Sequence, residues 1–370
     1  MKYSIEIGKI VEGALKHDQV KVINYTKQLV SKLEKDADVR SAAKFQHLLS
    51  SQMESALTPM NSSNTVAIPV DTESRMDLAD IIYPYQNDIK VILSKRNKEK
   101  LESFVLNYQN ADKLNSLGIN VSNSLLLYGP PGCGKTKCAY LIAKQLNLPL
   151  VVARLDSLIS SYLGTTAKNI RSLFEFAQKM PCVLFLDEFD AIAKARDDQH
   201  ELGELKRVVN SLLQNMDEYC QNGILIAATN HHELLDSAIW RRFQTVIEMP
   251  KPELEEVTAM IGNLPDFVDV SQIKPGQWKK VYDVLLGLSY SDIKNILNNM
   301  VKKLVLKDEN KVKFTDILAE VYLFRNHGNY TMEQMVQYLS EHGVSQKQAS
   351  LYFNVSTRQI KNCLERSEKI

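Results

Sequence analysis

The chain has 370 residues, of which 44% are hydrophobic and 24% charged, which is typical of a globular protein that folds in water. Because domains usually contain about 100–200 residues, this length predicts two or three compact units. The 45 Lys and Arg residues nearly balance the 44 Asp and Glu residues, so the formal net charge is +1. This balance excludes a global field that attracts nucleic acid or membranes, and any basic surface must be local.

Five cysteines are spread along the chain with neither the paired spacing of a metal site nor the density of a disulfide framework. They are Cys133, Cys138, Cys182, Cys220 and Cys363. The sequence also has no run of about 18 apolar residues and no charged-then-apolar leader at its start. We therefore expect no contact with a membrane and a location in the reducing cytoplasm.

The first 58 residues carry apolar side chains at helical spacing in three successive segments. We predict a small helical unit over residues 1–58, too small to be catalytic. It serves either as an interaction domain or as a purely structural extension. Residues 59–79 begin with a stretch rich in Ser, Thr, Asn and Pro, which indicates a linker.

Short apolar runs alternate with amphipathic helical segments over residues 80–250. Such alternation predicts a parallel sheet covered by helices on both faces, since each strand needs a crossover helix to reach the next. No strand pattern returns after Pro252, so we expect a helical lid over 251–325 and a helical appendage over 326–370. The expected strands are Leu125–Tyr128, Leu150–Ala153, Val183–Leu186, Ile224–Ala228 and Val246–Met249, and the expected helices are 136–146, 167–179 and 203–216.

A glycine-rich motif directly follows the first expected strand. Residues 129–136 read GPPGCGKT, which matches the P-loop (Walker A) pattern G-x-x-x-x-G-K-[ST] between a strand and a helix. Glycines let consecutive backbone N–H groups turn towards phosphate oxygens, and the helix N-terminus adds its positive end. We expect Lys135 to reach the β- and γ-phosphates of ATP and the Thr136 hydroxyl to hold Mg²⁺. The residues predicted to bind the nucleotide here are Gly129, Pro130, Pro131, Gly132, Cys133, Gly134, Lys135, Thr136 and Lys137.

Polar side chains also follow the next strands of the predicted sheet. Asp187 and Glu188 end an apolar strand, where two carboxylates are costly unless they meet a cation and a reaction. Asp187 suits a Mg²⁺ ligand, and Glu188 can polarise the water that attacks the γ-phosphate. Asn230, at the end of the adjacent strand, could orient the same water. Arg241 and Arg242 are either a solvated surface pair or the cations that neutralise transition-state charge across a subunit boundary.

Together these motifs resemble those of the AAA family of ring ATPases, within the AAA+ superfamily. The resemblance covers roughly residues 78–300 and is greatest for the group with katanin-like, spastin-like, Vps-four-like and proteasomal ATPases. It rests on GPPGCGKT, on LFLDEFDAIAKAR at 184–196, and on the block from Ala228 to Phe243. The resemblance implies an α/β P-loop core with a helical lid, ATP hydrolysis with Mg²⁺, and a homo-oligomer, generally a hexameric ring. It also implies that Asn230 is a sensor residue and that Arg241 and Arg242 are arginine fingers for the neighbour's nucleotide.

Two further segments align with this family. Tyr162, Leu163 and Gly164 resemble a pore loop that grips a substrate chain, although the aromatic and aliphatic side chains could simply anchor a loop on the core. The stretch of Asp80, Ile81 and Ile82 resembles the segment that packs against the adenine base. In the lid, Tyr290 stands where the family has a glycine, which puts base contact by that turn in doubt.

The C-terminal appendage shows helix-turn-helix spacing over residues 345–364. Thr357, Arg358, Lys361 and Asn362 would lie on its second helix. Residues 326–370 carry five Lys or Arg against four Glu, which is a weak footprint for phosphate binding. The pattern leaves open contact with DNA on one side and docking against protein or packing on the lid on the other, and it favours docking or lid packing.

The hypothesis that unites these features is a ring motor that remodels, unfolds or translocates a protein or peptide substrate through a central pore. No protease signature is present, since His232 and Glu233 lack the second histidine of H-E-x-x-H. A separate protease, such as the subtilisin-like partner of some bacterial defence ATPases, would have to supply degradation. The alternative is a nucleic-acid-associated ATPase switch that binds DNA through its C-terminal segment. A nucleotide-gated scaffold with negligible turnover fits poorly, because Glu188, Asn230 and both arginines are present.

Overall fold

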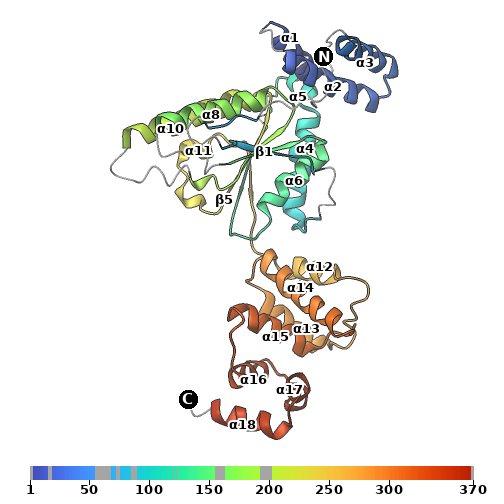
Figure 1. Cartoon of the computed structure of the whole chain (residues 1–370), viewed down its shortest axis with the longest axis vertical. Coiled ribbons are helices and arrows are strands. Elements are labelled where there is room, and N and C mark those ends of the chain that lie inside the picture. The colour runs from blue at the N-terminus through green and yellow to red at the C-terminus, as the bar shows by residue number, and fades with distance from the viewer. Residues whose placement is uncertain are drawn as a thin grey trace. The chain divides into compact units, whose positions relative to one another are not determined.

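A computed structural model describes residues 3–15, 19–54, 68–71, 76–84, 90–119, 121, 123–154, 163–191 and 202–367. The chain forms two compact units, which Figure 1 shows. The first unit comprises Met1–Val91, Lys95–Gly129 and Lys135–Met249. The second comprises Ile92–Ser94, Pro130–Gly134 and Pro250–Ile370.

The first unit is built on a 6-stranded sheet with the order β1-β3-β4-β5-β2-β6. Neighbouring strands are parallel except at one edge, where β1 runs antiparallel to β3. Every residue of β4 and of β5 is buried, which explains why these strands are continuous apolar runs rather than alternating ones. The strands are β1 (Ala79–Ile82), β2 (Ser124–Tyr128), β3 (Leu150–Ala153), β4 (Val183–Leu186), β5 (Ile224–Thr229) and β6 (Thr245–Glu248).

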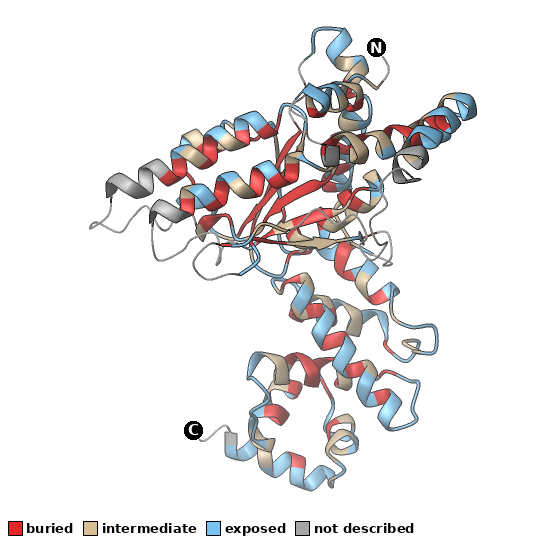
Figure 2. Cartoon of the chain, turned by 45° about the horizontal axis from the view of Figure 1, so that its top comes forward, coloured by how far each residue is buried: buried red, intermediate tan, exposed pale blue. Residues whose placement is uncertain are grey.

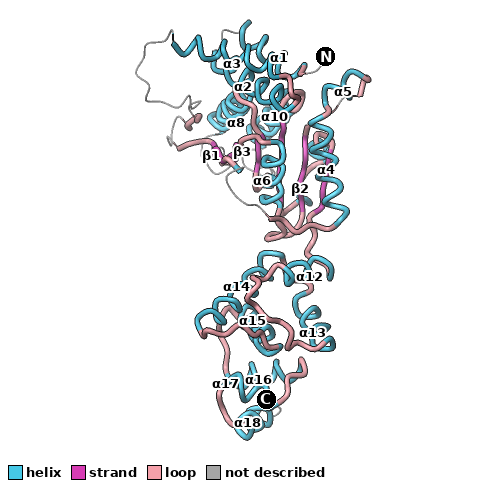
Figure 3. The backbone as a smooth tube through the Cα atoms, turned by 90° about the vertical axis from the view of Figure 1, so that its right-hand side faces the viewer, coloured by secondary structure: helices cyan, strands magenta, loops and turns pink. Residues whose placement is uncertain are grey.

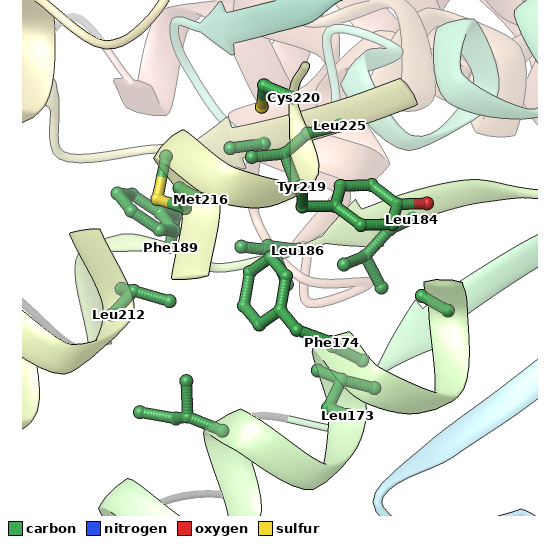
Figure 4. Packing of buried hydrophobic residues seen from close by; sticks show 14 of the residues in the cluster. Leu173, Phe174, Leu184, Leu186, Phe189, Leu212, Met216, Tyr219, Cys220 and Leu225 are labelled. Carbon is green, nitrogen blue, oxygen red and sulfur yellow. The ribbon is translucent and has the colours of Figure 1, made fainter. Parts of the chain in front are cut away.

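Helices cover both faces of the sheet (Figure 1). One face carries α8 (Leu163–Gln178) and α10 (Leu202–Tyr219), and the other carries α4 (Lys95–Gln109) and α6 (Lys135–Leu146). Figure 4 shows the packing beneath the first pair, where Phe174 meets Tyr219 edge-on with ring centroids 5.7 Å apart. In Figure 2 the central strands are buried, while the helices have one buried and one exposed side. The edge strands β1 and β6 are mostly of intermediate burial. The α/β class predicted for this core is confirmed.

The predicted strands all form, and none of their ends is displaced by more than one residue. Helix α8 begins four residues before its predicted start, and α10 ends three residues beyond its predicted end. Strand β1 is the exception, because no strand was predicted for Ala79–Ile82. Its four residues are too few to show a period, and its pairing with β3 depends on residues about 70 positions away.

Three helices precede the sheet: α1 (Ser4–Leu15), α2 (Gln19–Lys35) and α3 (Val39–Glu54). They share a small core of their own. They also contact the rest of the first unit, since the Asn24 side chain donates to the Lys179 carbonyl at 3.3 Å. The Ser4 backbone N–H likewise donates to Asp112, on α5 (Ala111–Ser116), at 3.2 Å. An interaction role for these helices stays a prediction.

The described residues of the second unit form helices joined by loops, as Figure 3 shows. One apolar cluster runs from the lid helices to the C-terminal helices. None of the helices in the described parts of either unit has both the length and the apolar content to cross a bilayer. The helices are α12 (Leu254–Gly262), α13 (Pro275–Leu285), α14 (Tyr290–Leu306), α15 (Phe314–Arg325), α16 (Met332–Glu341), α17 (Gln346–Phe353) and α18 (Thr357–Ser367).

Candidate functional site

The glycine-rich loop between β2 and α6 adopts backbone conformations that only glycine tolerates well. Gly129, Gly132 and Gly134 have φ values of +139°, +74° and +88°. A Cβ atom on Gly129 would lie 2.4 Å from the carbonyl oxygen of Met249, so a side chain there would also clash. The motif glycines are therefore required by the backbone geometry, independently of any ligand.

Lys135 opens α6 and is 7% exposed. Its ammonium group donates to the Gly129 carbonyl at 2.7 Å, across the loop. A buried ammonium must be hydrogen-bonded, because its desolvation is otherwise costly. The side chain is thus folded back over the loop, beside the N–H groups that open α6. This donor set suits phosphate oxygens.

Thr136 joins the loop to the end of β4. Its hydroxyl donates to Asp187 Oδ2 at 2.8 Å. Mg²⁺ in phosphate sites is held by one or two protein oxygens together with phosphate oxygens and water. The Thr136 hydroxyl and the Asp187 carboxylate supply such a pair of oxygens, so the residues present fit this ion.

Glu188 has an unusual backbone conformation. Its φ of +50° is in the left-handed region, which costs a non-glycine residue energy and is used at turns, helix ends and functional sites. Two contacts offset this cost: the Glu188 N–H donates to Asp187 Oδ1 at 2.9 Å, and the Phe189 N–H donates to the Ala228 carbonyl at 2.8 Å. Phe189 is fully buried, whereas Glu188 is exposed. The turn therefore anchors its aromatic ring and leaves the preceding carboxylate accessible.

Asp190 is a residue of this turn that the sequence analysis did not single out. It is 4% exposed, and its Oδ1 accepts the Thr229 hydroxyl at 2.9 Å and the Asn230 N–H at 3.4 Å. These bonds tie the turn after β4 to the end of β5. Asp190 therefore fixes the backbone that carries Asn230. In the sequence, Asp190 is the third carboxylate in the segment that follows β4. Its neighbours are apolar enough to be buried, and a buried carboxylate needs hydrogen-bond partners.

The two adjacent arginines differ in their surroundings. Arg242 is half-buried, with Nε 3.2 Å from the Asp217 carboxylate and Nη1 donating to the Ala238 carbonyl at 2.8 Å. Arg241 ends α11 (Ser237–Trp240) and is exposed, and its guanidinium makes no hydrogen bond or ion pair with the described part of the chain. Only Arg241 is thus available to a partner without breaking contacts.

The remaining predicted site residues are more scattered. Asp80, Ile81 and Ile82 lie in β1, where Asp80 accepts two bonds from Arg154 at 2.8 and 2.9 Å. Tyr162 lies outside the described residues, and Leu163 and Gly164 begin α8.

Five residues of the motif, Pro130–Gly134, belong to the second unit. Within that unit the Ser291 N–H donates to the Gly132 carbonyl at 3.1 Å, and a Cβ atom on Gly132 would lie 2.5 Å from Ser289 Oγ. Cys133 is buried, and Lys137 is exposed on α6. The structure therefore brings together Lys135, Thr136 and Asp187, and leaves the base contact and the pore loop as predictions.

Comparisons with known proteins show which proteins the chain is similar to. Residues 125–251 match the model of the ATPase family associated with various cellular activities (AAA). An uncharacterized AAA family ATPase of Sinorhizobium fredii is 42% identical over 252 residues, which cover 66% of this chain and 73% of that protein. A proteasome-activating nucleotidase of Pyrococcus furiosus is 38% identical over 170 residues, and proteasome-activating nucleotidase 2 of Halobacterium salinarum is 37% identical over 177.

The matched regions cover 43% of each nucleotidase, so this chain spans less than half of their length. The crystal structure of the FIGL-1 AAA domain aligns with a TM-score of 0.50 and 24% identity, over 67% of this chain and 86% of that one. At this identity the structural likeness speaks for the fold alone.

Proposed function

Because this chain belongs to the AAA family of ATPases and is an ATP hydrolase, we propose that it works as a ring motor that draws a polypeptide through a central pore. The observation that supports this best is the asymmetry of the two arginines. A transition state with developing charge needs a cation, and Arg241 is exposed with no hydrogen bond or ion pair among the described residues. Such a residue suits an active site that is completed by a neighbouring subunit.

Each subunit supplies the groups that bind the phosphates and activate water. We assign Lys135 and the loop N–H groups to the β- and γ-phosphates, and Thr136 and Asp187 to Mg²⁺. When bound, this ion withdraws charge from the phosphate oxygens. Glu188 takes the general-base role for the attacking water, and Asn230 orients that water. The Asp190 carboxylate holds the Asn230 backbone in place for this task.

The neighbouring subunit supplies Arg241 in this proposal, and Arg242 keeps the end of α11 in position. Arg242 is tied to α10 through Asp217 and to α11 through the Ala238 carbonyl. Using it as a finger would break both contacts, whereas Arg241 loses none. AAA ATPases typically form rings, and six subunits is our expectation here.

The proposed substrate is a polypeptide. Support comes from the nucleotidases, whose names say that they activate proteasomes, and from the sequence of Tyr162, Leu163 and Gly164. We also propose that a separate protease can receive the threaded chain.

A reducing cytoplasm suits the cysteines of this chain, all of which are free thiols and four of which are buried. Burial raises the pKa of Cys138, Cys182 and Cys220 to about 12. Their thiols therefore stay protonated at neutral pH and serve as small apolar groups. This supports our placement of the protein in the cytoplasm.

The decisive experiment mixes two inactive variants. Glu188→Gln removes the base but keeps Arg241, and Arg241→Ala removes the finger but keeps the base. In mixed rings some sites combine an intact base with an intact neighbouring finger, so ATPase activity should rise well above the sum of the two separate variants. Arg242→Ala is the matched control: it keeps both Glu188 and Arg241, so it should lose stability but remain active alone, and mixing it with Glu188→Gln should not raise activity above the sum of the two.

Mass measurements with and without ATP should accompany the mixing experiment. Specific activity of the wild type should rise with protein concentration as rings assemble. If activity is flat in concentration, or if the mixture never exceeds the sum of its parts, Arg241 does not act across a boundary. Loss of peptide-stimulated activity in Tyr162→Ala, with basal activity kept, tests the threading step separately.

A further inference from the structure

The last three helices of the chain form a compact group within the second unit. Helices α16 and α17 both pack against α18. The buried residues of the group are Met335, Val336, Leu339, Val344, Ala349 and Ile360. Helix α17 has eight residues, and only Asn354, Val355 and Ser356 separate it from α18. Two short helices joined by a three-residue turn and supported by a third helix have the form of a helix-turn-helix.

The turn between α17 and α18 is tightly specified. Asn354 ends α17 in the left-handed conformation, with φ 53° and ψ 46°, which asparagine tolerates better than most residues. The Val355 N–H then donates to the Ser350 carbonyl at 3.0 Å. Ser356 and Gln359 exchange bonds at the start of α18, where the Gln359 N–H donates to Ser356 Oγ at 3.3 Å and the Ser356 N–H donates to Gln359 Oε1 at 2.9 Å. The start of α18 is thus fixed, rather than frayed.

We infer that α18 is a recognition helix that binds the major groove of double-stranded DNA. Its exposed side carries Thr357, Arg358, Lys361 and Asn362, while Ile360 faces the core. These are the side chains that recognise base edges: Arg and Lys donate to guanine, Asn pairs with adenine, and Thr contacts thymine or a phosphate. They lie in the first half of the helix, which is the part that enters the groove in such motifs.

The same surface does not suit a protein partner as well. A helix that docks into a protein groove presents apolar anchors at i, i+3, i+4 and i+7. The exposed positions of α18 are all polar or charged, and its partly buried Cys363 and Leu364 pack against the cluster of the second unit. The exposed apolar residue of this group, Leu351, is on α17 rather than α18.

The charge of this surface is modest. Glu365 lies 3.8 Å from Lys361 and is exposed, as is Lys361 itself. An exposed pair of this kind is worth little, so a phosphate group can replace it as the partner of the lysine. Because few cations take part, we expect binding of micromolar order that weakens steeply with salt.

Binding of a fluorescein-labelled duplex of random sequence to the full-length protein tests this inference. Anisotropy is measured from 50 to 200 mM NaCl without nucleotide, so that failure of the ring mechanism cannot affect the result. The test variant is Arg358→Ala/Lys361→Ala. Its matched control, Lys279→Ala/Lys294→Ala, removes the same charge from exposed positions on α13 and α14 of the same unit. ATPase activity verifies that each variant is folded.

We expect the wild type to bind, and the slope of log affinity against log salt to become less steep by about 1 in the α18 variant, since Lys361 is the residue with a phosphate partner and each lost phosphate contact contributes about 0.9. The control should keep the wild-type slope. Absence of wild-type binding at 50 mM NaCl overturns the inference. So does an equal loss in both variants, because it would show that general charge and not α18 attracts the DNA.

Base reading is tested by enrichment from a random duplex library. The wild type should enrich a short motif, and Asn362→Ala should relax the preference at one position while leaving the salt slope unchanged. A motif that is the same for the wild type, Asn362→Ala and Arg358→Ala would overturn the assignment of α18 as the reading helix.

Discussion

The carboxyl ends and the amino ends of β4 and β5 are held together by opposite kinds of contact. At the carboxyl ends, Thr136 donates to Asp187 and Thr229 donates to Asp190. At the amino ends, Tyr219 packs edge-on against Phe174, and its hydroxyl lies 3.6 Å from the Cys182 sulfur, both in buried positions. Polar groups that hydrogen-bond to one another thus hold the carboxyl ends, and packed aromatic and thiol side chains hold the amino ends.

Because of this difference, we expect the two ends of β4 and β5 to have different roles. Buried polar groups are costly unless every partner is in place, so the carboxyl ends depend on precise geometry. Apolar contacts are non-directional, so a further helix can pack near the amino ends without precise geometry. Helix α2 lies there, since Asn24 donates to the Lys179 carbonyl. Substitutions at the first end should therefore change turnover, and substitutions at the second should change the free energy of unfolding.

The largest expected effect follows Lys135→Met at the carboxyl ends. This substitution keeps an unbranched side chain but removes the charge that we assign to the phosphates. ATPase activity should fall about a thousandfold, or about 4 kcal/mol, as when a preorganised charge contact is lost. Lys98→Met is the matched control, because Lys98 is exposed on α4 of the same unit and has no place in the predicted site. If Lys98→Met were as damaging as Lys135→Met, the loop would not be the phosphate site.

Tyr25→Ala should give the largest effect at the amino ends. Tyr25 is 6% exposed on α2, and burial together with the nearby Cys182 holds its pKa well above the usual range. Truncating a buried aromatic side chain should lower the free energy of unfolding by about 3 kcal/mol in urea titrations. Leu15→Ala, at a residue that is 78% exposed on α1, should change it by less than about 0.5 kcal/mol.

If the amino ends determine stability alone, Tyr25→Ala should keep its ATPase activity per folded molecule within about twofold of the wild type. A loss of activity like that of Lys135→Met would mean that the two ends are coupled. The helices before the sheet would then act on the catalytic groups, and the separation of roles would be wrong.

Asp190→Ala should have a smaller effect, because Asp190 acts through Asn230 rather than on the substrate. We expect the kcat to fall about tenfold while the KM for ATP changes little, as is usual for residues that orient a functional side chain. Asp190→Asn retains an oxygen acceptor for the Thr229 hydroxyl and should recover most of the lost kcat. A purely structural role would instead lower stability in both variants without this rescue.

Local patterns were enough to predict most of the core, and long-range pairing explains what they missed. The apolar runs of β4 and β5 and the glycines of the loop can be recognised within a few residues. Asp190 could not be placed, because its partner Thr229 is 39 residues away along the chain. Similarly, the different surroundings of the two arginines could not be predicted, because Asp217 beside Arg242 is 25 residues away along the chain.

The smallest expected effect is a pH dependence at the amino ends. Burial raises the pKa of Cys182 from 9.0 to about 12, so the thiol stays neutral in the folded protein while it ionises in the unfolded chain. The stability that this thiol contributes is therefore complete below pH 9 and is lost as the pH rises towards 12. Between pH 8 and pH 10 this single group should lower the free energy of unfolding by about 1 kcal/mol.

The Cys182→Ala variant isolates this contribution from the other groups that titrate in the same range. The variant should be less stable than the wild type by a constant amount up to pH 8, because it lacks the packed sulfur. That difference should then shrink between pH 9 and pH 10, since only the wild type has a buried thiol to ionise on unfolding. A difference that stays constant to pH 10 would show that the Cys182 pKa is not raised. Water would then reach the Cys182 thiol in the folded protein.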